Sequence, residues 1–332
     1  MNGIIISGQP RSGKSTLVKS LKNKKNILAC NVDAKLIKMI REQDINFQDE
    51  SLKKIIKNLI GRCVFQDSQK KIKTSILNEI NVPLEEIVRN LKKHPENNRP
   101  EFFFFKILES SREYLKKKFW LLPDLGAEDY FEYIKKKSTK IKIIFLFRNP
   151  LESITASLYW RTYPQKKKNI FELIVRWNYS VSRAKYLTKT YSDRVELLYY
   201  NEINKKLHIK NLGEVNFNYD IKKTYFSFNG NEWLCPDNKY RKLLNENEKL
   251  HIMSCCSYNF ENQKKSNLNL SLFIKRKYSR LLNFLFLNLS FISPLLSRRL
   301  MDFYFSPAKL ILEKIKEVFK LIKKNINKFL LS

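Results

Sequence analysis

GIIISGQPRSGKSTL, from Gly3 to Leu17, combines a short apolar run, a glycine-containing turn and the beginning of a helical pattern. GIIIS is β-branched and short, as expected of a buried strand, and helical spacing follows from Lys14. Four residues satisfy the spacing G-x-x-x-x-G-K-[ST]: Gly8, Gly13, Lys14 and Ser15. Backbone N–H groups of such a turn converge at the positive end of the helix, and glycines let a phosphate approach closely. Since the whole chain contains only 7 Gly, chance is the weaker alternative, and the stretch predicts a phosphate-binding loop.

Two further runs have the character of strands. KIKIIFLFRNP, from Lys140 to Pro150, is a continuous apolar stretch, as expected of a central parallel strand that is buried on both faces. Its proline can begin the helix predicted over residues 151–161, because the first helical residue needs no backbone donor. RVELLYY, from Arg194 to Tyr200, comes after a predicted helix over Phe171–Thr190. Strands that alternate with helices predict an α/β fold, with a P-loop-type parallel sheet flanked by helices.

The length of 332 residues allows one such core together with an insertion or an appendage. We expect residues 1–262 to form the α/β domain, with a charged helical insertion at about 34–118, and residues 263–332 to form a basic helical extension. Residues 281–296 are apolar, but they are interrupted by polar residues and are too short to span a bilayer. From Pro307 onward the pattern predicts a basic amphipathic helix with one apolar stripe: Ile311, Ile315, Val318, Ile322, Ile326 and Phe329.

The chain carries 64 Lys and Arg against 32 Asp and Glu, a formal net charge of +32. A field of this size attracts polyanions, anionic nucleotides and acidic membrane surfaces without choosing among them. The C-terminal region therefore leaves two alternatives, attachment to an anionic membrane surface through residues 281–332 or packing on the globular domain. Because the N-terminus shows no secretory signal, we expect a cytoplasmic protein, with attachment to the inner face of a membrane as an additional hypothesis.

Arg148 ends the second strand-like run, at the carboxyl edge of the expected sheet, where open α/β sheets bind their ligands. Three hydroxyl residues lie in the first turns of the following helix: Ser153, Thr155 and Ser157. An arginine and hydroxyl groups beside a helix N-terminus make a second phosphate site. The alternative is a surface arginine that ends a strand and has no ligand.

These two sites resemble the motifs of the sulfotransferases that depend on 3′-phosphoadenosine 5′-phosphosulfate. ISGQPRSGKSTL (Ile6–Leu17) looks like their first motif, a strand followed by P-[KR]-S-G-[ST]-T, which holds the 5′-phosphosulfate. IIFLFRNPLESITAS (Ile143–Ser157) looks like the second, a strand followed by R-[ND]-P and a helix with a serine, which holds the 3′-phosphate. RVELLYYNEI (Arg194–Ile203) and the segment Tyr240–Glu261 resemble a later strand and helix of the family, so that the likeness covers roughly residues 1–260.

The resemblance implies a transferase that moves a sulfuryl group from this donor to a hydroxyl of an acceptor, without a metal. The acceptor stays unidentified, with a cell-envelope glycan or glycolipid as one candidate, and nucleic acid is not expected as a partner. The donor-binding residues that the resemblance implies, with the last of them near the adenine, are Gly8, Arg11, Ser12, Gly13, Lys14, Ser15, Thr16, Arg148, Ser157 and Tyr200.

The chain departs from the family pattern at three places. The serine of the second motif stands one residue later than usual, because Ala156 occupies its position. Other hydroxyls of the same helix therefore stay alternatives for its role: Ser153 and Thr155. Lys14 replaces a small hydroxyl residue of the first motif. The segment FWLLPDLGAEDY (Phe119–Tyr130) lacks the lysine or histidine that supplies the acid/base group of the family.

In sulfuryl transfer an acceptor hydroxyl attacks sulfur in line, and the 5′-phosphate of the nucleotide leaves. Negative charge builds on the bridging and sulfuryl oxygens, so fixed cations carry much of the catalysis, and Arg11 and Lys14 are the candidates. Asp124 and Glu128 lie in the segment where a base is expected. The alternative for each of them is an ordinary solvated carboxylate.

A P-loop kinase or NTPase is the alternative enzyme, for which Lys14 and Ser15 are well suited. It requires an aspartate at the end of a second buried strand to hold Mg²⁺, whereas the best strand ends in Arg148, and Asp33 follows only the weak strand NILACNVD. A basic nucleic-acid- or membrane-binding protein is the third hypothesis, because aromatic and basic residues alternate in Lys275–Phe286, but no recognised nucleic-acid motif is present.

Overall fold

The fold is described from a computed structural model of the chain. It describes residues 2–10, 12–22, 24–30, 34–40, 54, 65–66, 73–74, 82–92, 99–138, 140–159, 169–199, 207–209, 213–215, 226–228, 231–233, 243–256 and 270–306.

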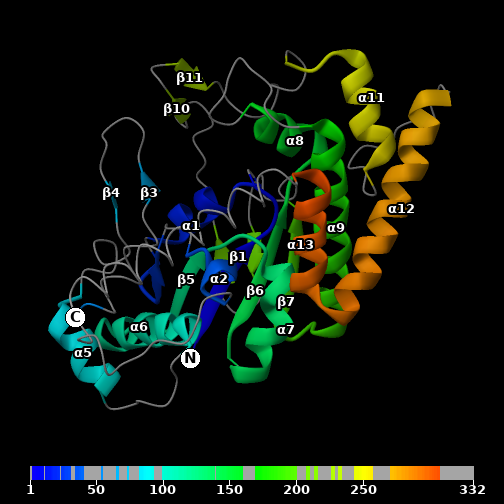
Figure 1. Cartoon of the computed structure of the whole chain (residues 1–332). Coiled ribbons are helices and arrows are strands. Elements are labelled where there is room, and N and C mark those ends of the chain that lie inside the picture. Colours follow the sequence, from blue (N-terminus) through cyan, green and yellow to red (C-terminus); the bar gives the residue numbers. More distant parts are fainter. Residues whose placement is uncertain are drawn as a thin grey trace, which may run out of the picture.

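Five parallel strands form the central sheet, in the order β2–β5–β1–β6–β7 (Figure 1). β1 (Gly3–Ser7) is the middle strand and pairs with β5 (Phe119–Pro123) on one side and with β6 (Lys142–Phe147) on the other. β7 (Val195–Tyr199) pairs with β6, and β2 (Ile27–Ala29) pairs with β5. Helices connect the consecutive strands of this sheet, as parallel pairing requires, and the predicted α/β class is confirmed.

The strand β5 is one that the sequence does not predict. Its run FWLLP is only five residues long, ends in proline and follows three lysines. A run this short fits a buried strand and a short buried helix equally well. Pairing on both sides makes it a strand, since Leu121 lies opposite Ile4 of β1 and Phe119 lies opposite Ile27 of β2. This correction matters for the site, because β5 runs beside β1 and leads directly into Asp124.

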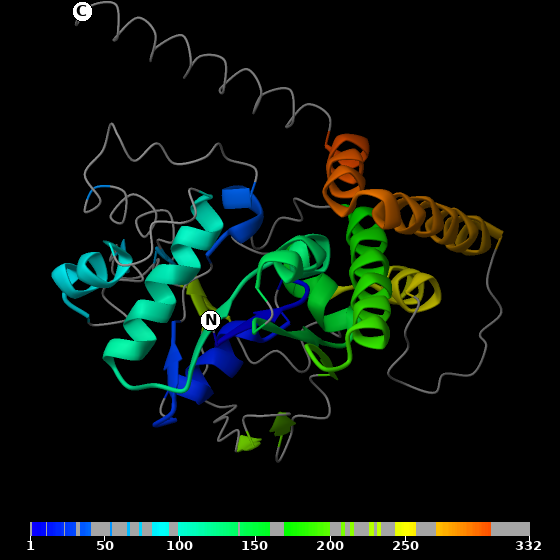
Figure 2. The same ribbon diagram turned by 90° about the horizontal axis from the view of Figure 1, so that it is seen from below.

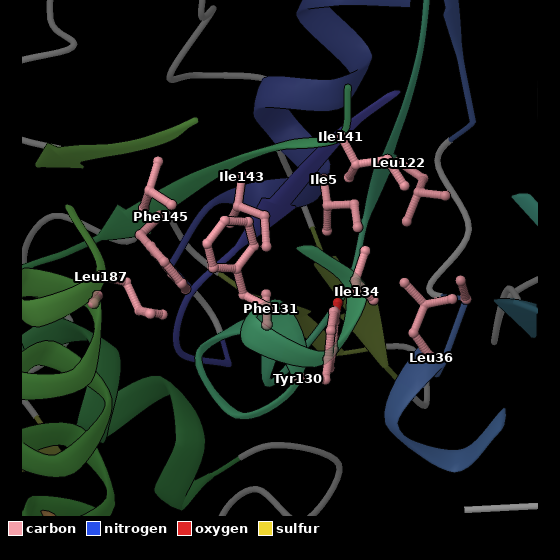
Figure 3. Packing of buried hydrophobic residues seen from close by; sticks show 14 of the residues in the cluster. Ile5, Leu36, Leu122, Tyr130, Phe131, Ile134, Ile141, Ile143, Phe145 and Leu187 are labelled. Atoms are coloured by element: carbon pink, nitrogen blue, oxygen red, sulfur yellow. The ribbon is translucent and has the colours of Figure 1, made fainter. Parts of the chain in front are cut away.

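Side chains alternate between the two faces of the sheet, as the two-residue period of a strand requires. Ile5 and Ile143 belong to a large apolar cluster on one face, part of which Figure 3 shows. The helices that contribute to it are α2 (Leu36–Ile40), α5 (Leu84–Lys92), α6 (Pro100–Tyr114), α7 (Ala127–Lys137), α8 (Pro150–Leu158), α9 (Ile170–Thr190) and α11 (Glu246–Cys255). On the other face Ile4 and Ile6 pack against α1 (Lys14–Lys22). The central strands are buried on both sides, which explains their continuous apolar sequences.

Local signals set the beginnings of α8 and α9. The Asn149 side chain accepts a hydrogen bond from Leu151 N at 2.9 Å, and Pro150 occupies the first turn of α8. The Asn169 side chain accepts from Phe171 N at 2.8 Å and begins α9 in the same way. Both helices occupy positions that the sequence predicts for them.

The segment between residues 34 and 118 contains two short strands that the sequence does not predict. β3 (Phe65–Gln66) and β4 (Lys73–Thr74) form an antiparallel pair, ahead of the helix α5 (Leu84–Lys92). A ladder of two residues leaves no periodic pattern for sequence reasoning to detect. Similar short pairs occur later in the chain: β8 (Leu207–Ile209) with β9 (Gly213–Val215), and β10 (Phe226–Phe228) with β11 (Asn231–Trp233).

Two helices of the C-terminal region pack against α9. α12 (Leu270–Ile292) and α13 (Pro294–Phe305) form a hairpin, which lies beside α9 in Figures 1 and 2. An apolar cluster of these three helices contains Val175, Tyr179, Leu282, Phe286 and Met301. No helix in the described ranges is long and apolar enough to cross a membrane. The amphipathic helix predicted from Pro307 onward lies outside the described residues.

Candidate functional site

Parallel strands end at the same edge of a sheet, and the segments that follow β1, β5 and β6 therefore meet there. Gly8 follows β1, Asp124 follows β5 and Arg148 follows β6. The backbone N–H of Asp124 donates to Ile6 O at 3.0 Å, which holds the beginning of its segment against β1. The carboxyl edge thus brings together three residues that the sequence singles out, from distant parts of the chain.

The turn between β1 and α1 requires glycine at both of its ends. Gly8 has a φ of +126°, and a Cβ atom there would lie 2.2 Å from the carbonyl oxygen of Leu146 in β6. Gly13 has a φ of +93°. Only glycine adopts such angles without strain, so a side chain is excluded at both positions. The loop therefore begins in direct contact with the strand that leads to Arg148.

Lys14 lies inside this loop and bonds to it. Its Nζ donates to Gly8 O at 3.1 Å, to Gln9 O at 2.6 Å and to Ser12 Oγ at 3.4 Å, and the residue is 8% exposed. All three acceptors are neutral oxygens of the loop, so the ammonium group keeps the loop closed around itself. An anion that enters the loop can take the place of these acceptors, because charge-assisted hydrogen bonds are the stronger ones.

Three hydrogen bonds hold the loop and the end of β1 against the surrounding helices: Ser153 Oγ to Pro10 O at 3.3 Å, Gln9 Nε2 to Arg176 O at 3.1 Å, and Ala127 N to Ser7 Oγ at 3.1 Å. The helices α7 and α8 start shortly after β5 and β6 and begin at this edge. Helix N-termini carry partial positive charge, so their dipoles add to the charge of Lys14. The edge is therefore suited to anions at more than one point.

Arg148 is buried at the beginning of α8, with 6% of its surface exposed. Its guanidinium pairs with the carboxylate of Glu152, one helical turn further on. Both side chains lie at the N-terminal end of α8, where the helix dipole favours an anion, and the Glu152 carboxylate is such an anion. A second phosphate at Arg148 must therefore share the guanidinium with Glu152 or displace it.

The three hydroxyls of α8 have different surroundings. Ser153 donates to the loop at Pro10, whereas Thr155 Oγ1 donates to Leu151 O of its own helix at 2.6 Å. Ser157 is buried, with 5% of its surface exposed. Ser153 is thus the hydroxyl of these three that connects the Arg148 segment with the glycine loop.

Asp124 and Glu128, the two candidate bases, are both buried, so the alternative that they are solvated carboxylates is wrong. Asp124 accepts from Tyr130 Oη at 2.6 Å and from Leu36 N at 3.3 Å. Glu128 accepts from Ser180 Oγ of α9 at 2.5 Å. Asp124 therefore belongs to the carboxyl edge beside β1, whereas the carboxylate of Glu128 lies in the contact between α7 and α9.

A partly buried group of charged side chains joins α7, α9 and α13, and no sequence signal points to it. Asp129 accepts from Tyr179 Oη at 2.7 Å and pairs with Arg298 at 3.3 Å. Burial raises the pKa of Asp129 to about 7 and also raises the pKa of Tyr179. Asp302 of α13 pairs with Arg176 of α9 at 2.7 Å. The group therefore ties the C-terminal hairpin to the core.

The described residues that remain from the sequence prediction belong to the loop and to α1. Ser12 is fully buried, Ser15 is exposed in the first turn of α1, and Thr16 follows it in the same helix. Arg11 and Tyr200 lie outside the described residues.

Comparison with known proteins finds similarity of fold alone. No family model and no curated protein matches the sequence. The sulfotransferase domain of the olefin synthase from Synechococcus is 16% identical, with a TM-score of 0.36 over 61% of this chain and 67% of that domain. A sulfotransferase from Mycobacterium avium is 13% identical, with a TM-score of 0.34 over 61% of this chain and 59% of its own length. Similarity of this extent concerns the arrangement of strands and helices and assigns no activity to this chain.

Proposed function

We propose that the protein is a sulfotransferase that moves a sulfuryl group from 3′-phosphoadenosine 5′-phosphosulfate to a hydroxyl of an acceptor. The observation that carries the proposal is the juxtaposition of two cationic segments on neighbouring strands. The glycine loop after β1 contacts β6 at Leu146, and Ser153 of the Arg148 segment donates to the loop at Pro10. A nucleotide with anionic groups at both of its ends matches a site with cations at both of its ends.

In this proposal the loop holds the 5′-phosphosulfate and the beginning of α8 holds the 3′-phosphate. The acceptor oxygen forms a bond to sulfur while the bond between sulfur and the bridging phosphate oxygen breaks. The electron pair of the broken bond leaves with the 5′-phosphate, and the hydroxyl proton passes to a base. Lys14, together with Arg11, stabilises the charge that develops on the bridging oxygen.

Asp124 is our candidate for the base. It directly follows β5 at the edge where Gly8 lies, whereas Glu128 bonds to Ser180 in the contact between two helices. The hydrogen bond from Tyr130 holds the carboxylate in place, and a proton taken from the acceptor would reside on it. As the acceptor class we propose a hydroxyl-bearing glycan or glycolipid of the cell envelope.

Ligand-induced stabilisation tests the donor site. We expect adenosine 3′,5′-bisphosphate without Mg²⁺ to raise the melting temperature of the full chain, because a ligand that binds only the folded state stabilises it. Lys14→Ala and Arg148→Ala should each remove most of this shift. Arg89→Ala is the matched control, because Arg89 forms an ion pair on α5 and its side chain is 67% exposed. A shift that appears only with ATP and Mg²⁺ contradicts the proposal.

Transfer is tested with radiolabelled sulfate donor and a cell-envelope extract. We expect labelled product with the wild-type chain and a strong reduction with Arg11→Ala and with Asp124→Asn. If Asp124→Asn retains full transfer while Lys14→Ala loses it, the donor site stands and the assignment of the base is wrong.

Magnesium-dependent phosphoryl transfer is the second candidate, and the position of Asp124 favours it. An aspartate after a buried strand beside the glycine loop is what a P-loop kinase uses to hold Mg²⁺. The sequence offers only Asp33, after a weak strand, for this role, whereas β5 leads directly into Asp124. Against this candidate, both carboxylate oxygens of Asp124 accept hydrogen bonds within the protein. Loss of an ATP–Mg²⁺ shift in Asp124→Asn, with no response to adenosine 3′,5′-bisphosphate, would decide for it.

A further inference from the structure

The helix α12 is apolar on the side that faces away from the core as well as on the side that packs against it. Its packed side consists of residues spaced three or four apart, among them Leu282 and Phe286. The opposite side carries a second apolar row at helical spacing, with exposed fractions from 46% to 83%: Leu270, Ile274, Leu281, Phe284, Leu285 and Ile292. A surface helix of a water-soluble protein normally carries charged and polar residues there.

The helix α13 repeats this arrangement. Met301 packs into the core, whereas the opposite side exposes a shorter apolar row: Leu296 at 47%, Leu300 at 39% and Phe303 at 56%. The two helices are joined by bonds between their packed parts, since Ser297 Oγ donates to Phe286 O at 2.6 Å. The hairpin thus presents apolar rows on both of its helices, which we call the outer rows. Exposed apolar groups of this extent mark an interaction surface.

The charge around the outer rows has one sign. α12 contains no acidic residue, and two of its exposed basic residues lie on or beside its row at helical spacing: Lys277 and Arg280. In α13 the exposed Arg299 lies next to Leu300, and the acidic residue Asp302 pairs with Arg176 of the core. Aliphatic and aromatic side chains flanked by lysine and arginine are the pattern of helices that lie in the headgroup layer of a membrane.

We propose that the outer rows of α12 and α13 dock the protein on an anionic lipid surface, with the hairpin lying in the headgroup layer. The apolar side chains enter the boundary with the acyl chains, and the basic side chains contact the lipid phosphates. This role is independent of the transferase proposal, because none of these residues belongs to the carboxyl edge of the sheet.

Charge distinguishes a lipid surface from the other possible occupants. A second copy of the chain would bring Lys277 and Arg280 close to like charges of its own hairpin, which is unfavourable. The segment 307–332 is also rich in lysine, including Lys309, Lys316 and Lys320, so it would meet the same repulsion on the rows. An anionic membrane satisfies both the apolar surface and the positive charge.

Vesicle sedimentation of the full chain tests the proposal. We expect binding to vesicles of phosphatidylcholine mixed with phosphatidylglycerol and little binding to phosphatidylcholine alone. The double variant Leu281→Ser, Phe284→Ser should weaken binding by roughly tenfold or more, because two exposed apolar side chains no longer enter the membrane. Tyr114→Ser is the matched control, because Tyr114 is 46% exposed and belongs to α6, a helix that lies far from the hairpin in Figures 1 and 2.

A charge variant sharpens the result. Lys277→Glu should weaken binding to the anionic vesicles by about tenfold, whereas Lys25→Glu, in the exposed turn before β2, should change it only slightly. An unchanged melting temperature of each variant shows that the fold is kept, as expected for substitutions of exposed residues.

Three outcomes would overturn the proposal. The first is no binding of the wild-type chain to anionic vesicles. The second is binding that the Leu281→Ser, Phe284→Ser variant retains in full but that deletion of residues 307–332 abolishes. The third is a dimer of the wild-type chain in light scattering that the same variant converts to a monomer, since the outer rows would then be an interface between two copies.

Discussion

The carboxyl edge of the sheet and the buried contact of α7, α9 and α13 both collect charged side chains, but they hold them in different ways. At the edge each of the two cations bonds to a residue close in sequence, since Lys14 bonds to Gly8 and Arg148 pairs with Glu152. In the helix contact Arg298 pairs with Asp129, 169 residues away in the chain. Local pairs can exchange a partner for a ligand without separating parts of the fold. Long-range pairs hold parts of the fold together.

This difference separates two kinds of charged residue that the sequence cannot tell apart. Substitutions at the edge should change ligand binding at modest cost in stability, unless they change the backbone. Substitutions in the helix contact should change stability and leave ligand binding largely intact. Four experiments examine this division.

Gly8→Ala has the largest expected effect, because it changes the backbone of the edge. Its Cβ would lie 2.2 Å from the Leu146 carbonyl oxygen at a φ of +126°, so β1 and β6 must move apart. We expect a loss of about 3 kcal/mol in the free energy of unfolding, measured in urea, and no response to adenosine 3′,5′-bisphosphate. Gly126→Ala is the control, because its Cβ would meet only ordinary contacts at 3.6 Å and 3.7 Å, and it should cost about 1 kcal/mol. Equal effects of the two substitutions would refute the close-contact argument.

Arg298→Met should lower the free energy of unfolding by about 2 kcal/mol, because it leaves the Asp129 carboxylate buried without its cation. The value is smaller than for a fully buried pair, since the Arg298 side chain is 28% exposed. Arg89→Met breaks an exposed pair with Glu86 and should cost less than about 0.5 kcal/mol. Urea unfolding gives both values. A loss of nucleotide binding in Arg298→Met, without a loss of stability, would contradict the division between the regions.

Asp129 should make the free energy of unfolding vary with pH. Burial raises its pKa in the folded chain to about 7, well above that of an ordinary carboxyl, so the folded chain binds a proton that the unfolded chain has lost. The contribution of this bound proton to the free energy of unfolding is complete below about pH 4 and is lost as the pH rises towards 7. The free energy of unfolding then falls by at most about 1.4 kcal/mol per pH unit. Unfolding measured between these values should show this decline in the wild type and a flatter profile in Asp129→Asn. Identical profiles would mean that Asp129 does not titrate in this window.

Glu152→Gln has the smallest expected effect on stability and acts on binding. Removing the carboxylate takes away an anion that competes with a 3′-phosphate for the Arg148 guanidinium, so adenosine 3′,5′-bisphosphate should bind about three- to tenfold more tightly. Adenosine 5′-phosphosulfate, which has no 3′-phosphate, should bind as before. Glu86→Gln, which breaks the pair with Arg89 on α5, serves as the control. Isothermal titration calorimetry measures the dissociation constant of each nucleotide for the wild type and for both variants. Weaker binding in Glu152→Gln would show that the pair orients Arg148 for the ligand.

Much of the sheet is predictable from local sequence. The strands β1, β6 and β7 are apolar runs bounded by turn or helix signals, and Asn149 with Pro150 marks the beginning of α8. β5 is not predictable in this way, because five apolar residues that end in proline fit a short buried helix equally well. Its consequence is large, since the aspartate required by a kinase then stands at the edge of the sheet.

The candidate site is predictable where it depends on backbone chemistry and unpredictable where it depends on packing. Gly8, Gly13 and Lys14 form a loop whose spacing alone indicates an anion site. Asp124 and Glu128 have similar sequence surroundings, yet one bonds to Tyr130 at the edge and the other to Ser180 of α9. Which partner a carboxylate meets depends on how distant helices pack, and sequence periodicity does not contain that information.

Residue types and their spacing along the chain determine the glycine loop, the central apolar strands and the caps of α8, because these features arise from interactions within a few residues. The neighbours of β5 and the burial of Asp129 beneath α13 follow from the assembled fold. They join or shield groups far apart in the chain, and their energies come from burial and long-range pairing, which exist only once the elements have packed.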